Sequence, residues 1–509
     1  MSQDYSFPSV RRDGHVLILG LGETGLAAAR WCAAQGASLR ILDTRERPGA
    51  LDALLADGVT ADLCLGSDAL DVSALEGVHT LVLSPGLNPH LSPVSELLAA
   101  ARARKIEVLG EIELFARALA DLRAQGYAPR LAAVTGTNGK TTVTSLTRHL
   151  AHRCGVSVRA AGNISPAALA SLQDALAQND LPDIWVLELS SFQLETTSTL
   201  QPDVGVVLNL TQDHLDWHGD MQAYAKAKAR LLHMARVAVV NRDDTWVRAM
   251  VDDLAAESVR SFGSGLPVLT GDLGLQTQQG LAWLVRTEAT EMAEPLAASP
   301  RRKASAQVRV RQPGRIQALM PVDALKIQGL HNALNALAAL ALGAELGLDW
   351  APMLYALREF QGEAHRTELV RTVAGVDFID DSKGTNVGAT LAALRACVRP
   401  VVLIAGGLGK GQDFSPLAPA VRAHARAVLL IGQDGPRIAE ALADCGVLLE
   451  SCETLEQSVV RAMALAQPGD GVMLSPACAS MDMFRNYAHR SACFIEAVRE
   501  LALDHGEVA

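Results

Sequence analysis

The residues best suited to chemistry stand in the segment Gly136-Thr137-Asn138-Gly139-Lys140-Thr141-Thr142. This segment follows the apolar run 131–134 and precedes a helical pattern, so it is a glycine-containing turn between a strand and a helix start. Backbone N–H groups of such a turn bind phosphate, the Lys140 ammonium can reach the β- and γ-phosphates, and the Thr141 hydroxyl can bind Mg²⁺. The regular phosphate loop has Gly where this chain has Val134. The segment therefore predicts a variant loop that binds a nucleoside triphosphate.

A second glycine loop, Gly20-x-Gly22-x-x-Gly25, follows the strand pattern 16–19, and Asp43 ends the next strand pattern. This spacing matches the dinucleotide fingerprint, so a nicotinamide dehydrogenase is one hypothesis. The same loop can bind any diphosphate, however, and Asp43 can accept a hydrogen bond from any ribose. Glu23 adds negative charge inside the turn, which weakens the dehydrogenase hypothesis. Two anion loops in separate units favour a ligase or kinase that holds a nucleotide-linked substrate and ATP.

Further polar residues follow the apolar runs 80–83, 184–187 and 204–208. The turn at Ser84 can add N–H donors beside the first glycine loop. Glu188 is predicted to hold Mg²⁺, the alternative being a surface carboxylate that caps the next segment. His214, within Asp213-His214-Leu215-Asp216, is either a ligand of a second cation or a hydrogen-bonded structural residue. On spacing alone, Lys226, Lys228 and Arg230 form a solvated basic face of the predicted helix 221–235.

Three turns near the C-terminus also follow apolar strand patterns. They are Asp380-Asp381-Ser382-Lys383-Gly384-Thr385-Asn386, the glycine-rich run 406–411 and Ser475-Pro476-Ala477-Cys478-Ala479-Ser480. Open α/β sheets bind ligands at the carboxyl edge, where such turns gather. We therefore expect Lys383, Lys410 and Ser480 to line a site for an acidic substrate.

The elements that must position these residues alternate between apolar strands and Ala/Leu-rich helices from residue 16 to the C-terminus. This alternation predicts an α/β fold with mostly parallel sheets and flanking helices. We predict three domains, at residues 1–106, 107–363 and 364–509. The stretch Thr287–Gly314, rich in Ala, Glu, Pro, Ser and Arg, is interpreted as a solvated surface insertion, with a functional arm as the alternative.

Composition narrows the function classes. The chain has 509 residues, 49% of them hydrophobic, and a formal net charge of −11. It contains no basic block long enough to follow a nucleic acid backbone, so a nucleic acid partner is not expected. We find no leader-like start and no apolar run long enough to span a bilayer, which predicts a cytoplasmic protein without membrane insertion. The eight cysteines contain no C-x-x-C pair and predict neither a zinc site nor a disulfide framework.

Taken together, these motifs resemble those of the Mur ligases, the ATP-dependent amide-forming enzymes of peptidoglycan assembly. The resemblance covers all three units in family order. It rests on the phosphate loop 136–142 and on Gly162-Asn163-Ile164, Leu187-Glu188-Leu189-Ser190-Ser191-Phe192-Gln193-Leu194, Asp213-His214-Leu215-Asp216, Gly329-Leu330-His331-Asn332, His365-Arg366, the run 381–386 and the run 475–480. It implies Rossmann-like first and third domains, a P-loop ATPase-like central domain and a monomer.

The resemblance implies a ligase that joins D-glutamate to UDP-N-acetylmuramoyl-L-alanine and that needs ATP and two Mg²⁺ ions. Contacts to the UDP-linked substrate are implied for Thr24, Asp43, Thr44, Arg45, Ser84 and Asn163. Contacts to ATP are implied for Gly136, Thr137, Asn138, Gly139, Lys140, Thr141, Thr142, Asn332, Asn335, Arg366 and Asp381. The implied metal ligands are Thr141, Glu188, His214 and a carbamylated Lys228, and the implied catalytic set is Lys140, Glu188, His214 and Lys228. The implied D-glutamate residues are Lys383, Thr385, Lys410, Ser480 and Tyr487.

Two residues depart from the family pattern: Glu23 stands where an apolar residue is common, and Tyr487 stands where Phe is familiar. The stretch Thr287–Gly314 also lengthens the central domain. Folylpolyglutamate synthetase is the neighbouring ligase to exclude, because it uses a related phosphate loop and adds glutamate. From other classes, a dehydrogenase would depend on NAD, and a non-catalytic nucleotide-binding module would bind ADP without releasing phosphate.

Overall fold

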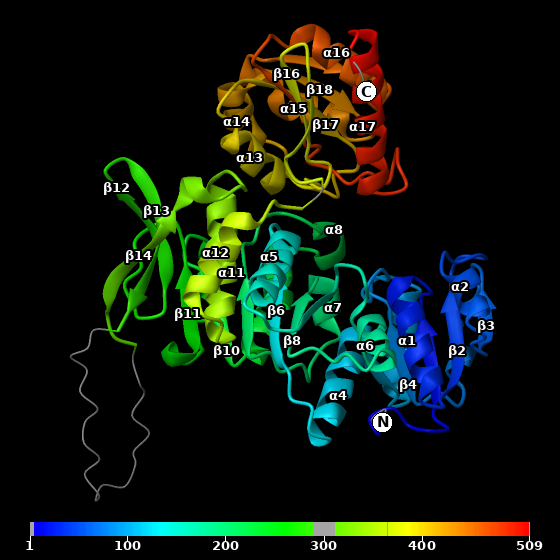
Figure 1. Ribbon diagram of the computed structural model, residues 1–509. Coiled ribbons are helices and arrows are strands. Elements are labelled where there is room, and N and C mark those ends of the chain that lie inside the picture. The colour runs from blue at the N-terminus through cyan, green and yellow to red at the C-terminus, as the bar shows by residue number, and fades with distance from the viewer. Residues whose placement is uncertain (1–4, 290–310, 364, 508–509) are drawn as a thin grey trace, which may run out of the picture. The chain divides into compact units, whose positions relative to one another are not determined.

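The computed structural model describes residues 5–289, 311–363 and 365–507 (Figure 1). Strands alternate with helices and form three mostly parallel sheets, which confirms the predicted α/β class. The chain divides into two compact units. The described parts of 1–209, 225–322 and 335–358 make the first, and those of 210–224, 323–334 and 359–509 make the second. The domain boundaries at residues 106 and 363 stay a prediction.

The first sheet belongs to the first unit and is wholly parallel. Its strands in spatial order are β3 (Asp62–Leu65), β2 (Ser38–Asp43), β1 (His15–Leu19), β4 (Thr80–Leu83) and β5 (Glu107–Leu109). Its helices are α1 (Glu23–Ala34), α2 (Leu51–Ala56), α3 (Val94–Ala103) and α4 (Glu111–Ala124). Leu17, Ile18 and Leu19 are successive and all fully buried, as expected for a central parallel strand covered on both faces.

The second parallel sheet carries the phosphate loop. Its strands in spatial order are β11 (Val259–Phe262), β10 (Val237–Asn241), β9 (Val204–Val207), β6 (Arg130–Thr135), β8 (Ile184–Glu188) and β7 (Val158–Gly162). The helices of the same stretch of chain are α5 (Lys140–Arg153), α6 (Ala168–Ala177), α7 (Ser191–Glu195), α8 (Leu215–His218), α9 (Met221–Met234), α10 (Thr245–Ala249), α11 (Leu330–Glu345) and α12 (Trp350–Glu359). The loop after β6 therefore lies at the carboxyl edge near the sheet centre, where α/β folds bind ligands.

One apolar core joins the first two sheets. It contains Trp31 from α1, Phe115 from α4, and Leu169 and Trp185 from α6 and β8, all nearly inaccessible to solvent. The rings of Phe115 and Trp185 meet edge to face with centroids 5.3 Å apart. Since burial of such side chains is the main favourable term in folding, this shared core fixes the first sheet against the second.

A small antiparallel sheet was not predicted from the sequence. It consists of β12 (Leu273–Gln278), β13 (Leu281–Glu288) and β14 (Arg315–Pro321) (Figure 1). The predicted insertion Thr287–Gly314 begins too early, because Thr287 is buried in β13 and pairs with Ile316. Residues 290–310 of that insertion lie outside the described residues.

The second unit holds the last sheet. Its strands in spatial order are β15 (Glu368–Val373), β16 (Val376–Asp380), β20 (Gly471–Leu474), β17 (Val401–Gly406), β18 (Ala425–Ile431) and β19 (Leu448–Ser451). Only the edge pair β15–β16 is antiparallel. The helices are α13 (Val387–Ala396), α14 (Leu417–His424), α15 (Gly435–Leu442), α16 (Leu455–Leu465) and α17 (Tyr487–Asp504). Separate cores cover the two faces, with Phe378 and Phe494 in one and Leu403 and Leu417 in the other.

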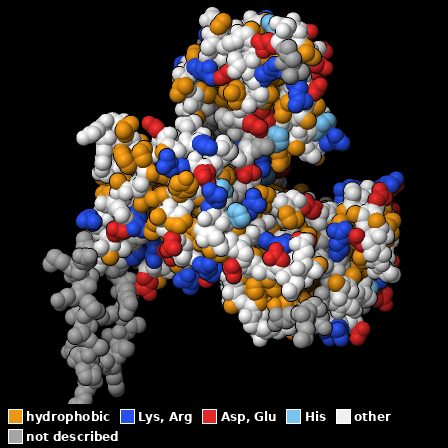
Figure 2. Space-filling model, in the orientation of Figure 1, with side chains coloured by type: hydrophobic (Ala, Val, Ile, Leu, Met, Phe, Trp, Pro, Cys, Tyr) orange, Lys and Arg blue, Asp and Glu red, His pale blue; other side chains and the backbone are white. Residues whose placement is uncertain are grey.

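The surface carries charged side chains of both signs. On the face that Figure 2 shows, Lys and Arg side chains lie among Asp and Glu side chains. Within the described ranges, no helix combines the length and apolar character needed to cross a lipid bilayer. All eight cysteines are free thiols.

Candidate active site

The phosphate loop is held in shape by two glycines and one asparagine. Gly136 and Gly139 have φ values of +150° and +84°, and a Cβ at Gly139 would lie 2.6 Å from Asn335 Oδ1. Thr137 N donates to the Asn209 carbonyl at 3.0 Å, and Asn138 N donates to Asn209 Oδ1 at 2.8 Å. These hydrogen bonds fix the conformation of the loop, which lowers the entropic cost of binding a ligand.

Lys140 and Thr141 open helix α5 directly after this loop. Lys140 Nζ donates to the carbonyls of Gly136 at 3.0 Å and Thr137 at 2.8 Å, so the ammonium lies over the loop. Thr141 is 4% exposed at the first turn of the helix. A helix N-terminus, a fixed ammonium and a hydroxyl together suit a polyphosphate, as the sequence predicted.

Glu188 is a buried carboxylate at the same edge. It ends β8 and pairs in register with Val134 of β6, two residues before the loop. Its Oε1 accepts a hydrogen bond from Asn163 Nδ2 at 2.8 Å, whereas the buried Oε2 has no hydrogen-bond partner. Leaving a buried anionic oxygen unpaired is unfavourable, so this arrangement fits a hard cation such as Mg²⁺.

The burial of Lys228 contradicts the interpretation, made from spacing alone, that this residue belongs to a solvated basic face. Its side chain is 1% exposed, while the neighbouring Lys226 is exposed. Lys228 Nζ donates to the Gly136 carbonyl at 2.9 Å, and Thr135 Oγ1 is 3.4 Å away. Spacing could not reveal this, because position 228 lies on the face of α9 that packs toward the sheet.

The first glycine loop is a close approach between backbone segments. A Cβ at Gly25 would lie 2.0 Å from the Gly20 carbonyl oxygen, so only glycine fits there. Ser84 Oγ donates to that same carbonyl at 2.7 Å, which places the predicted turn beside the loop. Thr24 lies in the first turn of α1. The unexpected Glu23 accepts a hydrogen bond from Ser165 Oγ at 2.8 Å and so tethers this loop to the second sheet.

Asp43 lies at the carboxyl end of β2 and is 3% exposed. Its carboxylate accepts from Leu21 N at 2.8 Å and pairs with Arg45 at 2.6 Å. Burial works to raise the pKa of Asp43, but hydrogen bonds from Arg45 and Leu21 outweigh it and hold the pKa below its usual value. Thr44 and Arg45 are exposed at this strand end. The result is an ionised acceptor at the predicted ribose position.

In the second unit, Asp381 follows β16 and is enclosed by three loops. Its Oδ2 accepts from Ser475 Oγ at 2.7 Å, and its Oδ1 accepts from Thr367 N at 3.2 Å. Burial raises the pKa of Asp381 to about 6, against which the Ser475 hydrogen bond and the Arg366 charge act. Asp381 therefore fixes the loop on which Lys383 and Thr385 stand.

The residues predicted to bind D-glutamate lie on neighbouring loops of the second unit. Lys383 Nζ lies 5.3 Å from the centre of the Tyr487 ring, a cation–π geometry, and Ser480 is 4% exposed. Arg490 is fully buried and donates to the carbonyls of Ser382 at 2.8 Å and Cys478 at 3.2 Å. Arg490 thus ties the loop of Lys383 to the loop of Ser480.

Asp213 gathers three polar groups in the same unit. Lys410 Nζ lies 3.3 Å from Asp213 Oδ1, and Asn386 Nδ2 donates to Asp213 Oδ2 at 3.2 Å. His214 Nε2 is 3.5 Å from Asp213 Oδ2. Asp216 lies in α8, and His214 has the left-handed backbone conformation, with φ of +55°.

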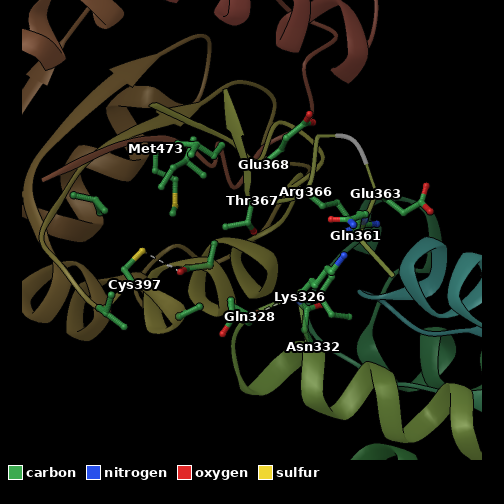
Figure 3. A pocket seen from close by; sticks show the side chains of 18 of the residues that line it. Lys326, Gln328, Asn332, Gln361, Glu363, Arg366, Thr367, Glu368, Cys397 and Met473 are labelled. Atoms are coloured by element: carbon green, nitrogen blue, oxygen red, sulfur yellow. Dashed lines mark hydrogen bonds between the residues drawn. The ribbon is translucent and has the colours of Figure 1, made fainter. Parts of the chain in front are cut away.

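A cavity of about 570 Å³ opens between the start of α11, residues 361–363 and 366–369, and α13 (Figure 3). Its size suits a small organic ligand. Asn332 and Arg366, both predicted to contact ATP, line its polar side, and Arg366 Nε is buried without a hydrogen-bond partner. Apolar side chains in the lining include Ile379, Cys397 and Met473.

Family models match most of the chain. A model described as "Mur ligase MurD-like, N-terminal domain" matches residues 14–110, "Mur ligase middle domain" matches 134–343, and "Mur ligase, glutamate ligase domain" matches 365–478. The chain belongs to the Mur ligase family. This membership replaces the dehydrogenase hypothesis for the first glycine loop, since that loop lies within a Mur ligase N-terminal domain.

Individual Mur ligases support the assignment. The chain is 62% identical over 499 residues to a UDP-N-acetylmuramoylalanine–D-glutamate ligase from Bordetella bronchiseptica, covering 97% of this chain and 98% of the relative. It is 54% identical to the enzyme of the same name from Burkholderia pseudomallei, covering 96% and 98%. Solved structures share the fold: a MurF from Acinetobacter baumannii (TM-score 0.56, 16% identity, covering 97% and 92%) and a UDP-N-acetylmuramate-alanine ligase from Thermotoga maritima (TM-score 0.55, 18% identity, covering 96% and 99%).

The structure assembles the predicted Mur ligase residues in two groups. The first unit brings together the phosphate loop, Asn163, Glu188, Lys228 and Asn335, and it also holds Thr24, Asp43, Thr44, Arg45 and Ser84. The second unit holds His214, Asn332, Arg366, Asp381, Lys383, Thr385, Lys410, Ser480 and Tyr487. Sequence reasoning gave no role to Asp380, Arg490 and Ser491. The paired acids at 380–381 were a signal for the first, whereas the helical residues 490 and 491 offered none.

Proposed function

We propose that this chain is an ATP-dependent ligase that adds D-glutamate to UDP-N-acetylmuramoyl-L-alanine. The reaction belongs to the synthesis of peptidoglycan precursors, and we assign it to the cytoplasm. The observation that carries the proposal is the 62% identity, over 97% of the chain, to a relative named for this activity. The phosphate loop with Lys140 over it, the buried Glu188 and the loops of Lys383 and Tyr487 in the second unit support it.

The assignment of residues is part of the proposal. For the UDP-linked substrate we assign Thr24, Asp43, Thr44, Arg45, Ser84 and Asn163. For ATP we assign the loop 136–142 with Asn332, Asn335, Arg366 and Asp381. For D-glutamate we assign Lys383, Thr385, Lys410, Ser480 and Tyr487. The domains 1–106, 107–363 and 364–509 would hold these substrates in turn, and we propose that the active form is a monomer.

The chemistry begins with the alanyl carboxylate of the UDP-linked substrate, which attacks the γ-phosphate of ATP to give an acyl phosphate and ADP. The free amine of D-glutamate then attacks the acyl carbon, and phosphate leaves from the tetrahedral intermediate. Lys140 would offset charge on the transferring phosphoryl group. Residues that hold the three substrates supply proximity, which replaces an improbable three-body encounter.

Mg²⁺ would be held by Thr141 and Glu188, with His214 and a carbamylated Lys228 for a second ion. When bound, the metal neutralises charge on the phosphate oxygens. Carbamylation would turn the buried Lys228 ammonium into an oxygen-donor anion, which a hard cation prefers. In its unmodified form, Lys228 instead donates to the Gly136 carbonyl.

The test mixes the purified chain with UDP-N-acetylmuramoyl-L-alanine, ATP, Mg²⁺ and either D- or L-glutamate, and follows phosphate. We expect release with the D-isomer alone and a product that contains one D-glutamate. In a parallel mixture with a folate in place of the UDP-linked substrate, phosphate release would favour folylpolyglutamate synthetase. ADP binding without phosphate release under any combination would favour a non-catalytic module and refute the proposal.

A further inference from the structure

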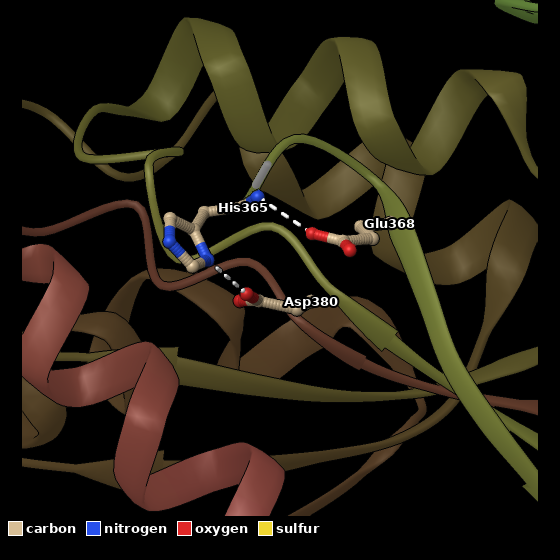
Figure 4. A group of neighbouring side chains, drawn as sticks. All are labelled: His365, Glu368 and Asp380. Carbon is tan, nitrogen blue, oxygen red and sulfur yellow. Dashed lines mark hydrogen bonds and ion pairs between the residues drawn. The ribbon is translucent and has the colours of Figure 1, made fainter. Parts of the chain in front are cut away.

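His365 is held on one side by a buried carboxylate (Figure 4). His365 Nδ1 lies 2.9 Å from Asp380 Oδ2, and Asp380 is fully buried at the end of β16. Ser491 Oγ donates to the same carboxylate oxygen at 2.5 Å and lies 2.7 Å from His365 Nδ1. Ser382 N donates to Asp380 Oδ1 at 2.9 Å. Asp380 thus accepts from several directions and is firmly oriented.

This arrangement selects one tautomer of the imidazole. A carboxylate accepts hydrogen bonds but donates none, so Nδ1 must carry the proton that it shares with Asp380. The tautomer is assigned from this network, and it leaves the lone pair of the neutral ring on Nε2. The His365 side chain is 28% exposed, so the ring is partly open to a ligand. A buried carboxylate that orients a histidine in this way is the arrangement that hydrolases use to prepare a general base.

His365 also lies beside the residues that we assign to the amino acid. Its ring is 6.4 Å from the Tyr487 ring, centre to centre, and Tyr487 in turn contacts Lys383. Lys383 N donates to the His365 carbonyl at 3.3 Å. His365 and Thr367 have φ values of +64° and +49°, a backbone conformation that is unfavourable for such residues and that clusters at functional sites.

The charged groups around His365 come from every element packed against it. They are Glu368 on β15, Asp380 and Asp381 at the end of β16, Arg366 and Lys383 on the loops, and Arg490 on α17. Glu368 Oε2 accepts from His365 N at 2.9 Å. His365, Glu368 and Asp380 have ligand atoms close enough to hold a cation. Hydrogen bonds already engage Nδ1 and both oxygens of Asp380, and so we assign a proton rather than a metal ion to this group.

We propose that His365 is the general base for the second half-reaction. An amino acid reaches the site mainly as its ammonium form, which has no lone pair for attack. Nε2 of His365 accepts one proton from the D-glutamate ammonium, the freed amine forms the bond to the acyl carbon, and the C–O bond to phosphate breaks. The second proton of the nitrogen leaves with phosphate or to water. This inference rests on the proposed function, since it assigns the base for that same reaction.

The experiment separates the two half-reactions of the purified chain. With UDP-N-acetylmuramoyl-L-alanine, ATP and Mg²⁺ but no D-glutamate, hydroxylamine traps the acyl phosphate as a hydroxamate. Hydroxylamine is a weakly basic nucleophile that is already neutral near pH 7, so it needs no base. We expect His365→Gln to form hydroxamate at the wild-type rate, while D-glutamate addition falls by about 10²- to 10³-fold, the range typical of a lost general base.

Two further variants keep the test decisive. His365→Ala should regain D-glutamate addition when imidazole is added, because the partly exposed site can admit the free base. Ser491→Ala retains the bond between His365 and Asp380 and should lose much less activity than His365→Gln. The inference is overturned if His365→Gln loses hydroxamate formation and amide formation equally, or if it retains wild-type amide formation. Absence of hydroxamate from the wild-type chain would refute the proposed function itself.

Discussion

Two buried glutamates of the first unit contrast a proposed metal ligand with a structural carboxylate. Glu113 and Glu188 are 1% and 2% exposed, respectively. Glu113 Oε2 accepts from the backbone N–H groups of Ser198 at 2.8 Å and Thr199 at 2.9 Å, and Oε1 accepts from Arg117 and the Thr199 hydroxyl. Glu188 accepts only from Asn163 through its side chain, and its second oxygen is unpaired. The same substitution should therefore have opposite effects at the two positions.

Glu188→Gln should strongly lower activity with little effect on folding. The amide oxygen can still accept from Asn163, and the exchange removes one unpaired anionic oxygen, so the free energy of unfolding should change by less than about 1 kcal/mol. Losing the carboxylate that we propose to hold Mg²⁺ should lower turnover by about 10²- to 10³-fold. The measurements are phosphate release across a Mg²⁺ titration and thermal unfolding of the same preparations.

Glu113→Gln is the matched control. Glutamine replaces one carboxylate oxygen with an NH₂ group. At either oxygen position, that NH₂ group would face hydrogen-bond donors instead of acceptors. At least two charge-assisted hydrogen bonds are lost, so the free energy of unfolding should fall by about 3 kcal/mol while the Mg²⁺ dependence of turnover stays unchanged. The reasoning is refuted if Glu188→Gln retains the wild-type Mg²⁺ dependence, or if the two variants are equally destabilised.

Four other predictions follow from single contacts. Lys140→Ala should remove turnover, and near-normal ATP consumption by that variant would contradict its place over the phosphate loop. Gly25→Ala should destabilise the chain by about 1–3 kcal/mol, because its Cβ would lie 2.0 Å from a carbonyl oxygen, whereas Gly22→Ala meets nothing within 4 Å and should match the wild type in thermal unfolding. Burial raises the pKa of Glu111 from 4.5 to about 7, so wild-type stability should fall as pH rises from about 4.5 to 7. Glu111→Gln should not show this fall. Above pH 7 its free energy of unfolding, measured in urea, should exceed that of the wild type by about 3 kcal/mol. Removal of CO₂ should lower activity and bicarbonate should restore it if Lys228 is carbamylated, and activity that is independent of CO₂ would count against the modification.

Much of the fold could be predicted from sequence because parallel strands leave a strong pattern. The continuous apolar runs before Gly20 and Gly136 correspond to β1 and β6, each buried on both faces. Polar residues that follow such runs must lie at one sheet edge, so the positions of Glu188 and Asp43 were predictable. The pattern failed for the sheet β12–β14. Its strands are partly exposed, and β13 and β14 are separated by the compositionally biased stretch after Thr287.

Site residues were predictable only where local spacing carries the information. The phosphate loop is such a case, because its conformation depends on Gly136 and Gly139 within one short segment. The burial of Lys228 depends instead on which face of α9 meets the sheet, a tertiary fact that an alternating run of Ala and basic residues obscures. The support of His365 by Ser491 joins residues 126 positions apart, and one sequence offers no signal for such a pair.

The apolar core that joins the first two sheets bears on how this chain can be dissected and recombined. A fragment ending near residue 106 would keep Trp31 but lose its core partners Phe115, Leu169 and Trp185. A large apolar surface would then be exposed to solvent, and the fragment should aggregate. A chimaera that takes its first sheet from another species must bring α4 and its partners on α6 as well. Sequence divergence in the first sheet and its glycine loop is therefore constrained by core residues that belong to α4, α6 and β8.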